Sequence, residues 1–256
     1  MKTATTSSSI LFGYWGLLIS LLVWTCGSPN SPTPVPEQGM LIAQPPELKP
    51  DRYNVAFLVM DGVYNTELTA PYDIFQHTIF RDGIKAMNTF MVANTLEPIT
   101  TFEGIQLLPH FNYLAEGLPE IDILVVPSAE HHLDTNLKDE AMLDFVRRTA
   151  DSADYVTSHC DGAFVLAEAG LLKDRVSTTF PSDIAAMRER YPELDIREDL
   201  LFVHDGPFIT SAGGAKSFEA ALYLAEHLYG DSIARSLAGG LVIDWDLSAV
   251  PHLVVE

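Results

Sequence analysis

Short apolar runs alternate with amphipathic segments along the chain from residue 54 onward. Apolar runs bounded by polar residues are typical of strands that are buried on both faces of a parallel sheet. Such runs predict strands over residues 54–60, 89–93, 121–126, 155–158, 201–204 and 208–211. The last two predict a β-hairpin around Asp205 and Gly206.

Helices are predicted where apolar residues recur on one side of a segment. The first helix is expected to open at Glu67, with Thr69 as its cap and Pro71 in its first turn. The others are expected over residues 141–150, 162–169, 182–191 and 217–229. This alternation of strands and helices predicts a single α/β domain, in which helices sandwich a mostly parallel sheet.

The first fifty residues follow a different pattern. One lysine and a polar run precede an apolar stretch from Ile10 to Trp24. About fifteen residues at about 1.5 Å each are short for a hydrocarbon core of about 30 Å, so we expect a cleaved signal peptide over residues 1–26. Residues 27–50 are rich in proline and polar residues, which predicts an extended linker that buries nothing. The α/β domain is then expected over residues 51–256.

Cys26 stands where the apolar stretch ends and the linker begins. This order resembles bacterial lipoprotein signals, in which the cysteine is lipidated and becomes the new N-terminus. The resemblance implies an exported protein that its lipid anchors to a membrane, in the periplasm or at the cell surface. Trp24 and Thr25 occupy positions where such signals prefer small residues. A plain secretory signal and an uncleaved anchor therefore stay open.

The chain carries 35 acidic and 15 basic residues, a formal net charge of -20. Such a charge repels a nucleic-acid phosphate backbone unless one face is locally basic, and no stretch of the sequence is. Residues 211–214 precede a helix but lack a dinucleotide or lysine-serine pattern, so they favour a close-packed turn over a phosphate site. We expect neither a nucleic-acid partner nor a cofactor.

Cys160 is the second of the two cysteines. It follows the strand at 155–158 and precedes Gly162 and a helix of small and apolar residues. This order is typical of a nucleophile elbow, where a reactive side chain lies on a tight turn between strand and helix. A thiol at the start of a helix is expected to have a lowered pKa. An inert core cysteine is the alternative. His159, one residue earlier, should point to the other face of the sheet.

Three segments resemble the ThiJ/PfpI superfamily, which has a flavodoxin-like fold of the class I glutamine amidotransferase type. They cover residues 55–75, 158–179 and 206–224, within a resemblance that extends from Asn54 to about Leu241. The second segment is the most specific. Its Cys-x-Gly-Ala-Phe-x-Leu-Ala-x-Ala-Gly-Leu-Leu pattern recurs in the subgroup of isonitrile hydratases and of amidase-like domains of transcription regulators.

The resemblance implies the parts of an active site. The family nucleophile falls on Cys160, and the acidic residue that lies beside it in the family falls on Glu67. A carboxyl group in that place can act as general acid or base. Backbone N–H groups of Ala129 and Asp161 are expected to stabilise developing charge. Family members commonly dimerise, so a homodimer is expected.

Other positions depart from the family pattern. Asp161 stands where family proteases and glyoxalase-like members have a histidine, and residues 178–181 read Thr-Thr-Phe-Pro where the regulators read Thr-Thr-His-Trp. The loop after Pro127 reads Ser-Ala-Glu-His-His where the family has two glycines. His131 and His132 have no third ligand at helical spacing, so no metal site is expected. Whether either histidine joins the active site stays open.

These residues favour a cysteine-dependent hydratase, or an amidase-type hydrolase, in which Cys160 attacks a small electrophilic molecule and Glu67 transfers protons. The absent histidines place the chain nearer to the isonitrile hydratases than to the proteases. The alternative is a non-catalytic module that binds a ligand or responds to oxidants through the same cysteine pocket. No helix-turn-helix follows the domain, so a direct role in transcription is not expected. The sequence does not identify the substrate.

Overall fold

The computed structural model describes residues 42–255. The predicted signal peptide over residues 1–26, the candidate lipidation site Cys26 and most of the predicted linker lie outside the described residues. The described part belongs to one compact unit of the chain. None of its helices is both long enough and apolar enough to cross a membrane.

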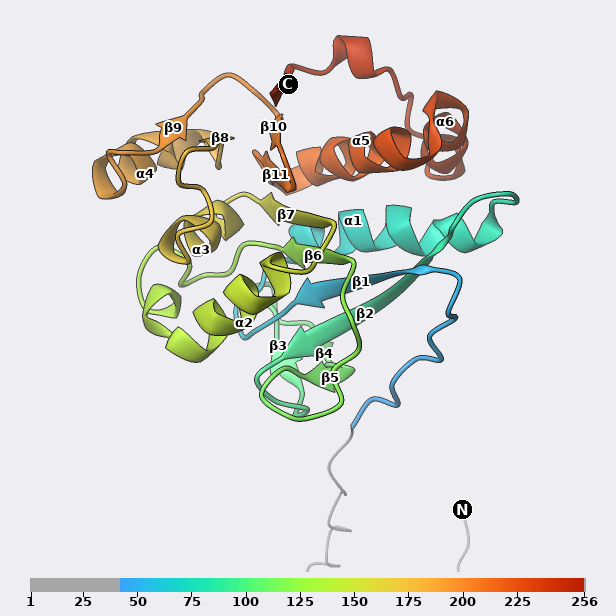
Figure 1. The fold of residues 1–256 in the computed structure, drawn as a ribbon, viewed down its shortest axis with the longest axis horizontal. Coiled ribbons are helices and arrows are strands. Elements are labelled where there is room, and N and C mark those ends of the chain that lie inside the picture. The colour runs from blue at the N-terminus through green and yellow to red at the C-terminus, as the bar shows by residue number, and fades with distance from the viewer. Residues whose placement is uncertain (1–41, 256) are drawn as a thin grey trace, which may run out of the picture. The chain divides into compact units, whose positions relative to one another are not determined.

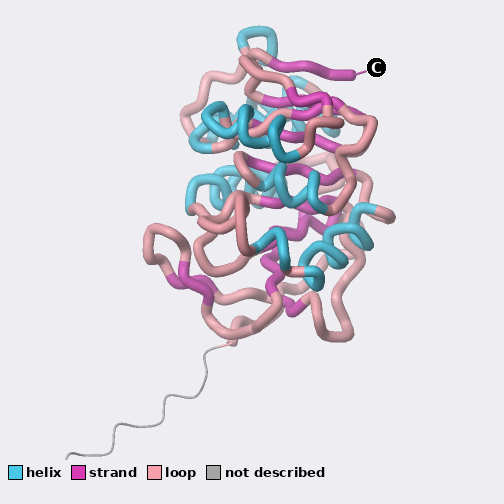
Figure 2. The backbone as a smooth tube through the Cα atoms, turned by 90° about the vertical axis from the view of Figure 1, so that its left-hand side faces the viewer, coloured by secondary structure: helices cyan, strands magenta, loops and turns pink. Residues whose placement is uncertain are grey.

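Eight strands form the central sheet, in the order β12-β10-β11-β7-β6-β1-β2-β5 (Figure 1). Neighbouring strands are parallel except for β10 and β11, which form the hairpin predicted around Asp205 and Gly206. Strand β12 forms one edge of the sheet, near the C-terminus (Figure 2). The strands are β1 (Tyr53–Leu58), β2 (Met87–Ala93), β5 (Phe111–Asn112), β6 (Ile123–Val126), β7 (Tyr155–His159), β10 (Phe202–Asp205), β11 (Phe208–Ser211) and β12 (His252–Val255).

Helices cover both faces of this sheet (Figure 1). One hydrophobic cluster joins the sheet to α2, α3 and α4, and a second joins it to α1, α5 and α6. Along β1, Ala56 and Leu58 belong to the first cluster, whereas Val55 and Phe57 belong to the second, because side chains alternate along a strand. The predicted α/β sandwich is confirmed. The helices are α1 (Asn65–Gln76), α2 (Glu140–Ala150), α3 (Gly162–Glu168), α4 (Ile184–Arg190), α5 (Ser217–Tyr229) and α6 (Asp231–Gly240).

Short elements complete the fold. Strands β3 (Ile99–Thr100) and β4 (Gln106–Leu107) form a hairpin, and β8 (Val176–Ser177) pairs with β9 (Asp195–Ile196). The 3-10 turns are η1 (His77–Phe80), η2 (Asn136–Lys138), η3 (Pro181–Asp183), η4 (Gly214–Lys216) and η5 (Leu247–Ala249). Turn η3 precedes α4 and η4 precedes α5. Both contribute to the candidate site, η3 through Asp183 and η4 through Gly214.

The first helix begins earlier than the sequence pattern predicts. α1 starts at Asn65, whose N–H donates to the carboxylate of Glu103 at 3.0 Å. Thr69 is not the cap, because its hydroxyl donates to the carbonyl of Asn65 inside the helix at 2.8 Å. Pro71 lies in the middle of the helix and not in its first turn. The predicted cap is wrong because a carboxylate from the β3–β4 hairpin, distant in sequence, accepts from the first N–H group.

Part of the predicted linker belongs to the domain. Residues 42–50 form neither helix nor strand, but Leu48 packs against the hydrophobic core. The N–H of Lys49 donates to the side-chain carbonyl of Asn88 at 3.1 Å, and the Asn88 amide donates back to the Lys49 carbonyl at 3.0 Å. The prediction that the linker buries nothing is therefore wrong for its last residues.

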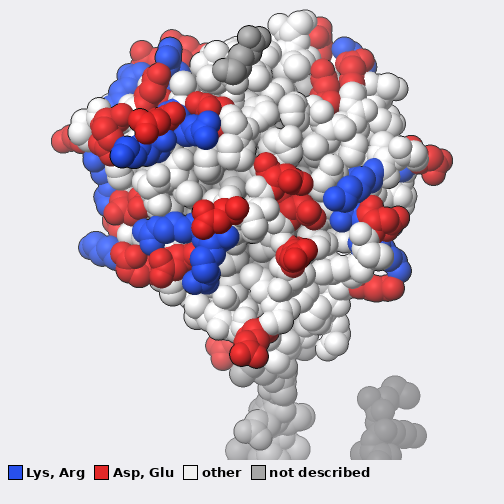
Figure 3. All heavy atoms as spheres, viewed as in Figure 1, with Lys and Arg blue, Asp and Glu red and all other residues white. Residues whose placement is uncertain are grey.

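Basic side chains lie among acidic ones on the face drawn in Figure 3. Typical pairs are Arg147 with Asp144, at 2.7 Å, and Arg188 with Glu198, at 3.1 Å. No continuous basic patch is seen on this face, so it offers no footprint for a phosphate backbone.

Candidate active site around Cys160

Cys160 occupies a strained turn between β7 and α3. Its φ angle is 54°, in the left-handed region that costs a non-glycine residue about 1–2 kcal/mol. Its N–H donates to the carbonyl of Ser211 at 2.9 Å, and its own carbonyl accepts from the Ala163 N–H at 3.2 Å and the Thr179 hydroxyl at 3.0 Å. Three hydrogen bonds hold this conformation in place. The turn has the geometry that the strand, cysteine, x, glycine, helix order predicts.

Two glycines make room for this turn. A Cβ atom on Gly162 would lie 2.1 Å from the carbonyl oxygen of Val126, and one on Gly213 would lie 2.3 Å from the Cβ of Cys160. Gly213 also has a φ of +76°, which L side chains rarely adopt. The backbone on either side of the thiol is therefore packed too closely for any side chain.

Alanine at position 213 is expected to destabilise the protein by about 3 kcal/mol, because it combines overpacking against Cys160 with a left-handed backbone. Gly214 is a matched control, since its φ is +57° but a Cβ there meets no atom within 4 Å. Gly214→Ala should lower the free energy of unfolding by only about 1 kcal/mol, which is the cost of the left-handed backbone conformation for alanine. Urea unfolding measures both. Equal losses in the two variants would show that Gly213 does not support the elbow.

Glu67 lies beside the thiol, as the family resemblance implies. It is the third residue of α1, is 5% exposed, and lines the same cavity as the Cys160 thiol. Its two carboxyl oxygens accept from the N–H groups of Ser128 and Gly214, each at 3.1 Å. Burial raises the pKa of Glu67, and these hydrogen bonds oppose that rise. The carboxyl group is thus fixed in position and poised to exchange a proton with sulfur.

The surroundings of the thiol raise its pKa. Burial is the largest cause, since Cys160 is 6% exposed, and the negative charges of Glu67 and Asp161 follow. The N–H of Asp161 hydrogen-bonds to the sulfur and acts in the opposite direction. The expectation of a lowered pKa is therefore wrong. A helix of seven residues carries a small dipole, which does not offset burial and two carboxylates.

The loop after β6 is arranged differently from the predicted oxyanion pocket. The N–H of Ala129 donates to Nδ1 of His132 at 3.2 Å and is not free to meet a substrate. Of the two predicted donors, only the Asp161 N–H faces the sulfur. The family resemblance implied Ala129 as a donor, but the imidazole of His132 accepts the hydrogen bond of its N–H group.

The two histidines of this loop do not line the cavity of the thiol. His132 is fully buried, and its Nε2 lies 3.4 Å from the sulfur of Met60. Burial lowers the pKa of His132 to about 3, so its neutral ring can accept from Ala129. The His131 ring is half exposed and lies 3.5 Å from the Asp134 carboxylate. His159 is buried beside the hydroxyl of Ser211, at 2.9 Å.

A cavity of about 260 Å³ opens at the thiol. It is lined by Tyr64, Glu67, Cys160, Asp161, Phe180 and Asp183, with no lysine or arginine among them. Tyr64, Phe180 and Asp183 were not identified from the sequence. The only signal for Phe180 was the departure of residues 178–181 from the regulator pattern, and Asp183 lies just beyond that segment. No cluster of three or more histidine, cysteine, aspartate or glutamate side chains suited to a metal occurs within the described residues.

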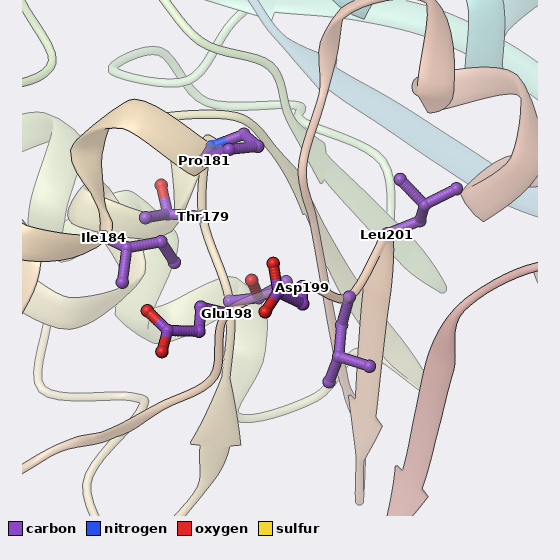
Figure 4. Close-up of a pocket in the computed structure, with 8 residues that line it drawn as sticks. Thr179, Pro181, Ile184, Glu198, Asp199 and Leu201 are labelled. Atoms are coloured by element: carbon purple, nitrogen blue, oxygen red, sulfur yellow. The ribbon is translucent and has the colours of Figure 1, made fainter.

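A second cavity, of about 330 Å³, lies on the other side of the segment 178–184 (Figure 4). Thr179 and Pro181 line this second cavity, whereas Phe180 and Asp183 line the cavity of the thiol. The segment therefore forms a wall between the two cavities. Thr179 links the wall to the elbow, because its hydroxyl donates to the Cys160 carbonyl.

Comparison with known proteins identifies the family of this fold and site. Residues 53–227 match the model of the DJ-1/PfpI family. The isonitrile hydratase of Pseudomonas putida is 32% identical over 183 residues, which cover 71% of this chain and 74% of that protein. The chain belongs to the DJ-1/PfpI family, and the predicted resemblance is confirmed.

Solved structures support the same fold. Drosophila melanogaster DJ-1beta superposes with a TM-score of 0.65 at 20% identity, covering 76% of this chain and all of that one. An AraC family transcriptional regulator from Pseudomonas putida gives a TM-score of 0.64 at 23% identity, covering 74% and 99%. At these identities the likeness concerns the fold alone.

Proposed function

We propose that the protein is a cysteine-dependent hydratase of small electrophilic molecules, similar in its reaction to isonitrile hydratase. The observation that carries the proposal is that the Cys160 thiol and the Glu67 carboxyl group line one cavity of about 260 Å³. Support comes from the 32% identity to isonitrile hydratase over 183 residues. Nucleophile, proton carrier and substrate space are then all present in one place.

The raised pKa of the thiol decides how the reaction starts. Cys160 is protonated at rest, so Glu67 takes the proton while the sulfur attacks the terminal carbon of the isonitrile. Glu67 then gives that proton to the same carbon. The product of this step is a thioimidate on Cys160, with a new carbon–sulfur bond and a new carbon–hydrogen bond.

The cavity favours uncharged substrates. Three of its lining side chains carry carboxyl groups and none is basic, so an anionic substrate would be repelled. The alternative role as a redox sensor finds less support, because oxidants react with the thiolate, and burial and carboxylates raise the pKa of this thiol. The following experiment distinguishes an enzyme from a module that binds its ligand without turnover.

The experiment incubates the purified protein with a panel of isonitriles, amides and α-oxoaldehydes, with Cys160→Ala as the blank. We expect N-substituted formamides from isonitriles, formed only by the protein that retains Cys160. Binding of an isonitrile without any formamide would instead favour the non-catalytic module. Formamide at the same rate from Cys160→Ala would refute a cysteine-dependent reaction.

The order of leader, cysteine and linker supports a second proposal, a lipid anchor on Cys26. The wild-type protein should partition with membranes after expression in bacteria, because an acyl chain buries many methylene groups in the bilayer. Cys26→Ser should leave the protein uncleaved or release it. The measurement is membrane fractionation combined with mass spectrometry of the mature N-terminus. An intact N-terminal methionine on the mature wild-type protein would contradict the anchor.

We also propose a homodimer, in which a neighbour helps to complete the site near the loop at 128–134. The β3–β4 hairpin supports this proposal, since Phe102 and Ile105 are each 53% exposed. The Phe102 ring packs 4.7 Å from the ring of Tyr64, which lines the cavity. Light scattering of the protein without residues 1–26 should give twice the monomer mass. A monomer mass across a wide concentration range would contradict the dimer.

A further inference from the structure

Two carboxyl groups other than that of Glu67 lie on the wall of the cavity. Asp161 directly follows the nucleophile, and Asp183 ends the turn η3. Both line the cavity of the thiol, and the charge of Asp183 is one of the causes that raise the pKa of Asp161. Asp161 is only 9% exposed. Two carboxyl groups in one largely buried place resist double ionisation, so the pair favours the state that holds one proton.

The neighbours of the pair keep this proton exchangeable at neutral pH. Burial, the charge of Asp183 and the charge of Glu67 raise the pKa of Asp161 to about 7, and the Thr179 hydroxyl, 3.5 Å away, opposes the rise. The other titratable groups that line the cavity are Tyr64 and the thiol. A group that is half protonated near neutral pH can both accept and donate a proton.

Glu67 and the pair reach the sulfur from different elements. Glu67 belongs to α1, which packs on one face of the sheet, whereas Asp183 precedes α4, which packs on the other. Both oxygens of Glu67 are also held by the N–H groups of Ser128 and Gly214. Glu67 is therefore held in place by these hydrogen bonds, and Asp161 and Asp183 provide further carboxyl groups in the same cavity.

We infer that Asp161, together with Asp183, activates the water that releases the product from Cys160. This inference rests on the proposed hydratase function. The pair accepts a proton from water as the water oxygen bonds to the thioimidate carbon, and it returns a proton to the substrate nitrogen. The carbon–sulfur bond then breaks while the hydroxyl proton of the adduct passes to sulfur. One water is consumed, one N-substituted formamide leaves and the thiol is restored, with no oxidant or reductant.

The test separates the two half-reactions with cyclohexyl isonitrile as the probe. In Asp161→Asn and Asp183→Asn the first half-reaction should proceed within a few-fold of the wild-type rate, while product release should slow by about 10²-fold. Intact-mass spectrometry of rapidly quenched samples should then show Cys160 carrying one isonitrile. Infrared spectra recorded without substrate should show a protonated carboxyl band in the wild type that titrates near neutral pH, is lost in Asp161→Asn, and titrates at lower pH in Asp183→Asn, where the charge of Asp183 no longer raises the pKa of Asp161.

Asp199→Asn is the matched control. Asp199 lines the second cavity, on the other side of the wall (Figure 4), and its φ of 63° is one that asparagine adopts readily. The Asp199→Asn variant should produce formamide at the wild-type rate without accumulating an isonitrile adduct on Cys160. Wild-type product release in Asp161→Asn, with no adduct, would overturn the inference while leaving the hydratase intact. Absence of both adduct and formamide in the wild type would refute the hydratase itself, and the inference with it.

Discussion

Glu67→Gln should lower kcat/KM for an isonitrile by about 10³-fold, with the activity of Cys160→Ala as the floor. Glutamine keeps the size of the side chain but cannot take the thiol proton. Because the pKa of the Cys160 thiol is raised, little thiolate exists without that transfer. The measurement is steady-state formamide production by both variants and the wild type. A fall of less than tenfold would remove Glu67 from the role of proton carrier.

A loss of stability must be distinguished from this loss of chemistry. A glutamine side chain has one carbonyl oxygen, so its NH₂ group must face either the Ser128 N–H or the Gly214 N–H, where each now donates to carboxylate. One unsatisfied donor costs about 1–3 kcal/mol, which urea unfolding will show. Glu103→Gln is the control, because its exposed carboxylate accepts from the start of the same helix but does not line the cavity. It should keep wild-type turnover.

The fold was predictable because its strands are buried on both faces. Apolar runs such as residues 121–126 can only be accommodated between two layers of helices, and α5 was predicted with its observed bounds, Ser217–Tyr229. Helix α6 and strand β12 were not predicted. α6 ends in Gly239 and Gly240, which are poor helix formers, and it is stabilised by packing on α5. β12 pairs only with β10 at the sheet edge, a contact that no local pattern encodes.

From the residues alone, the site was predictable only where its parts lie close together in the sequence. Cys160 and Gly162 are two residues apart on one turn, so the elbow could be recognised locally. Glu67 came from the family resemblance alone, since a carboxylate at a helix start has many ordinary explanations. Tyr64 and Asp183 reach the cavity through the tertiary fold. The raised thiol pKa depends on burial and on charges from several elements, which position along a helix does not reveal.

Asp161→Asn should make the protein more stable at pH 8, although we expect it to turn over more slowly. The pKa of Asp161 is raised from 3.8 to about 7 in the folded state, chiefly by burial and by Asp183. A carboxyl group with a raised folded pKa stabilises the fold while protonated, and this contribution is lost as pH rises from about 4 to about 7. Above pH 7 the wild type therefore carries a buried charge that costs up to about 4 kcal/mol. Asparagine has the same shape and no charge, so it removes this cost.

The measurement is the free energy of unfolding in urea at pH 5 and at pH 8, for the wild type and Asp161→Asn. The variant should exceed the wild type by up to about 4 kcal/mol at pH 8 but by only about 1–2 kcal/mol at pH 5, where Asp161 is ionised in the unfolded chain and still protonated in the folded protein. Comparison at one pH cancels the contributions of His132 and His159, whose pKa values burial lowers to about 3. If Asp161→Asn gains nothing at pH 8, the ionised Asp161 carboxylate is well solvated in the folded protein, and burial does not hold a proton on it near neutral pH. An Asp161→Asn variant that is more stable than the wild type at pH 8 and also releases product slowly would give a different answer. That result would mean that Asp161 lowers the stability of the folded protein and is retained because the reaction uses its proton.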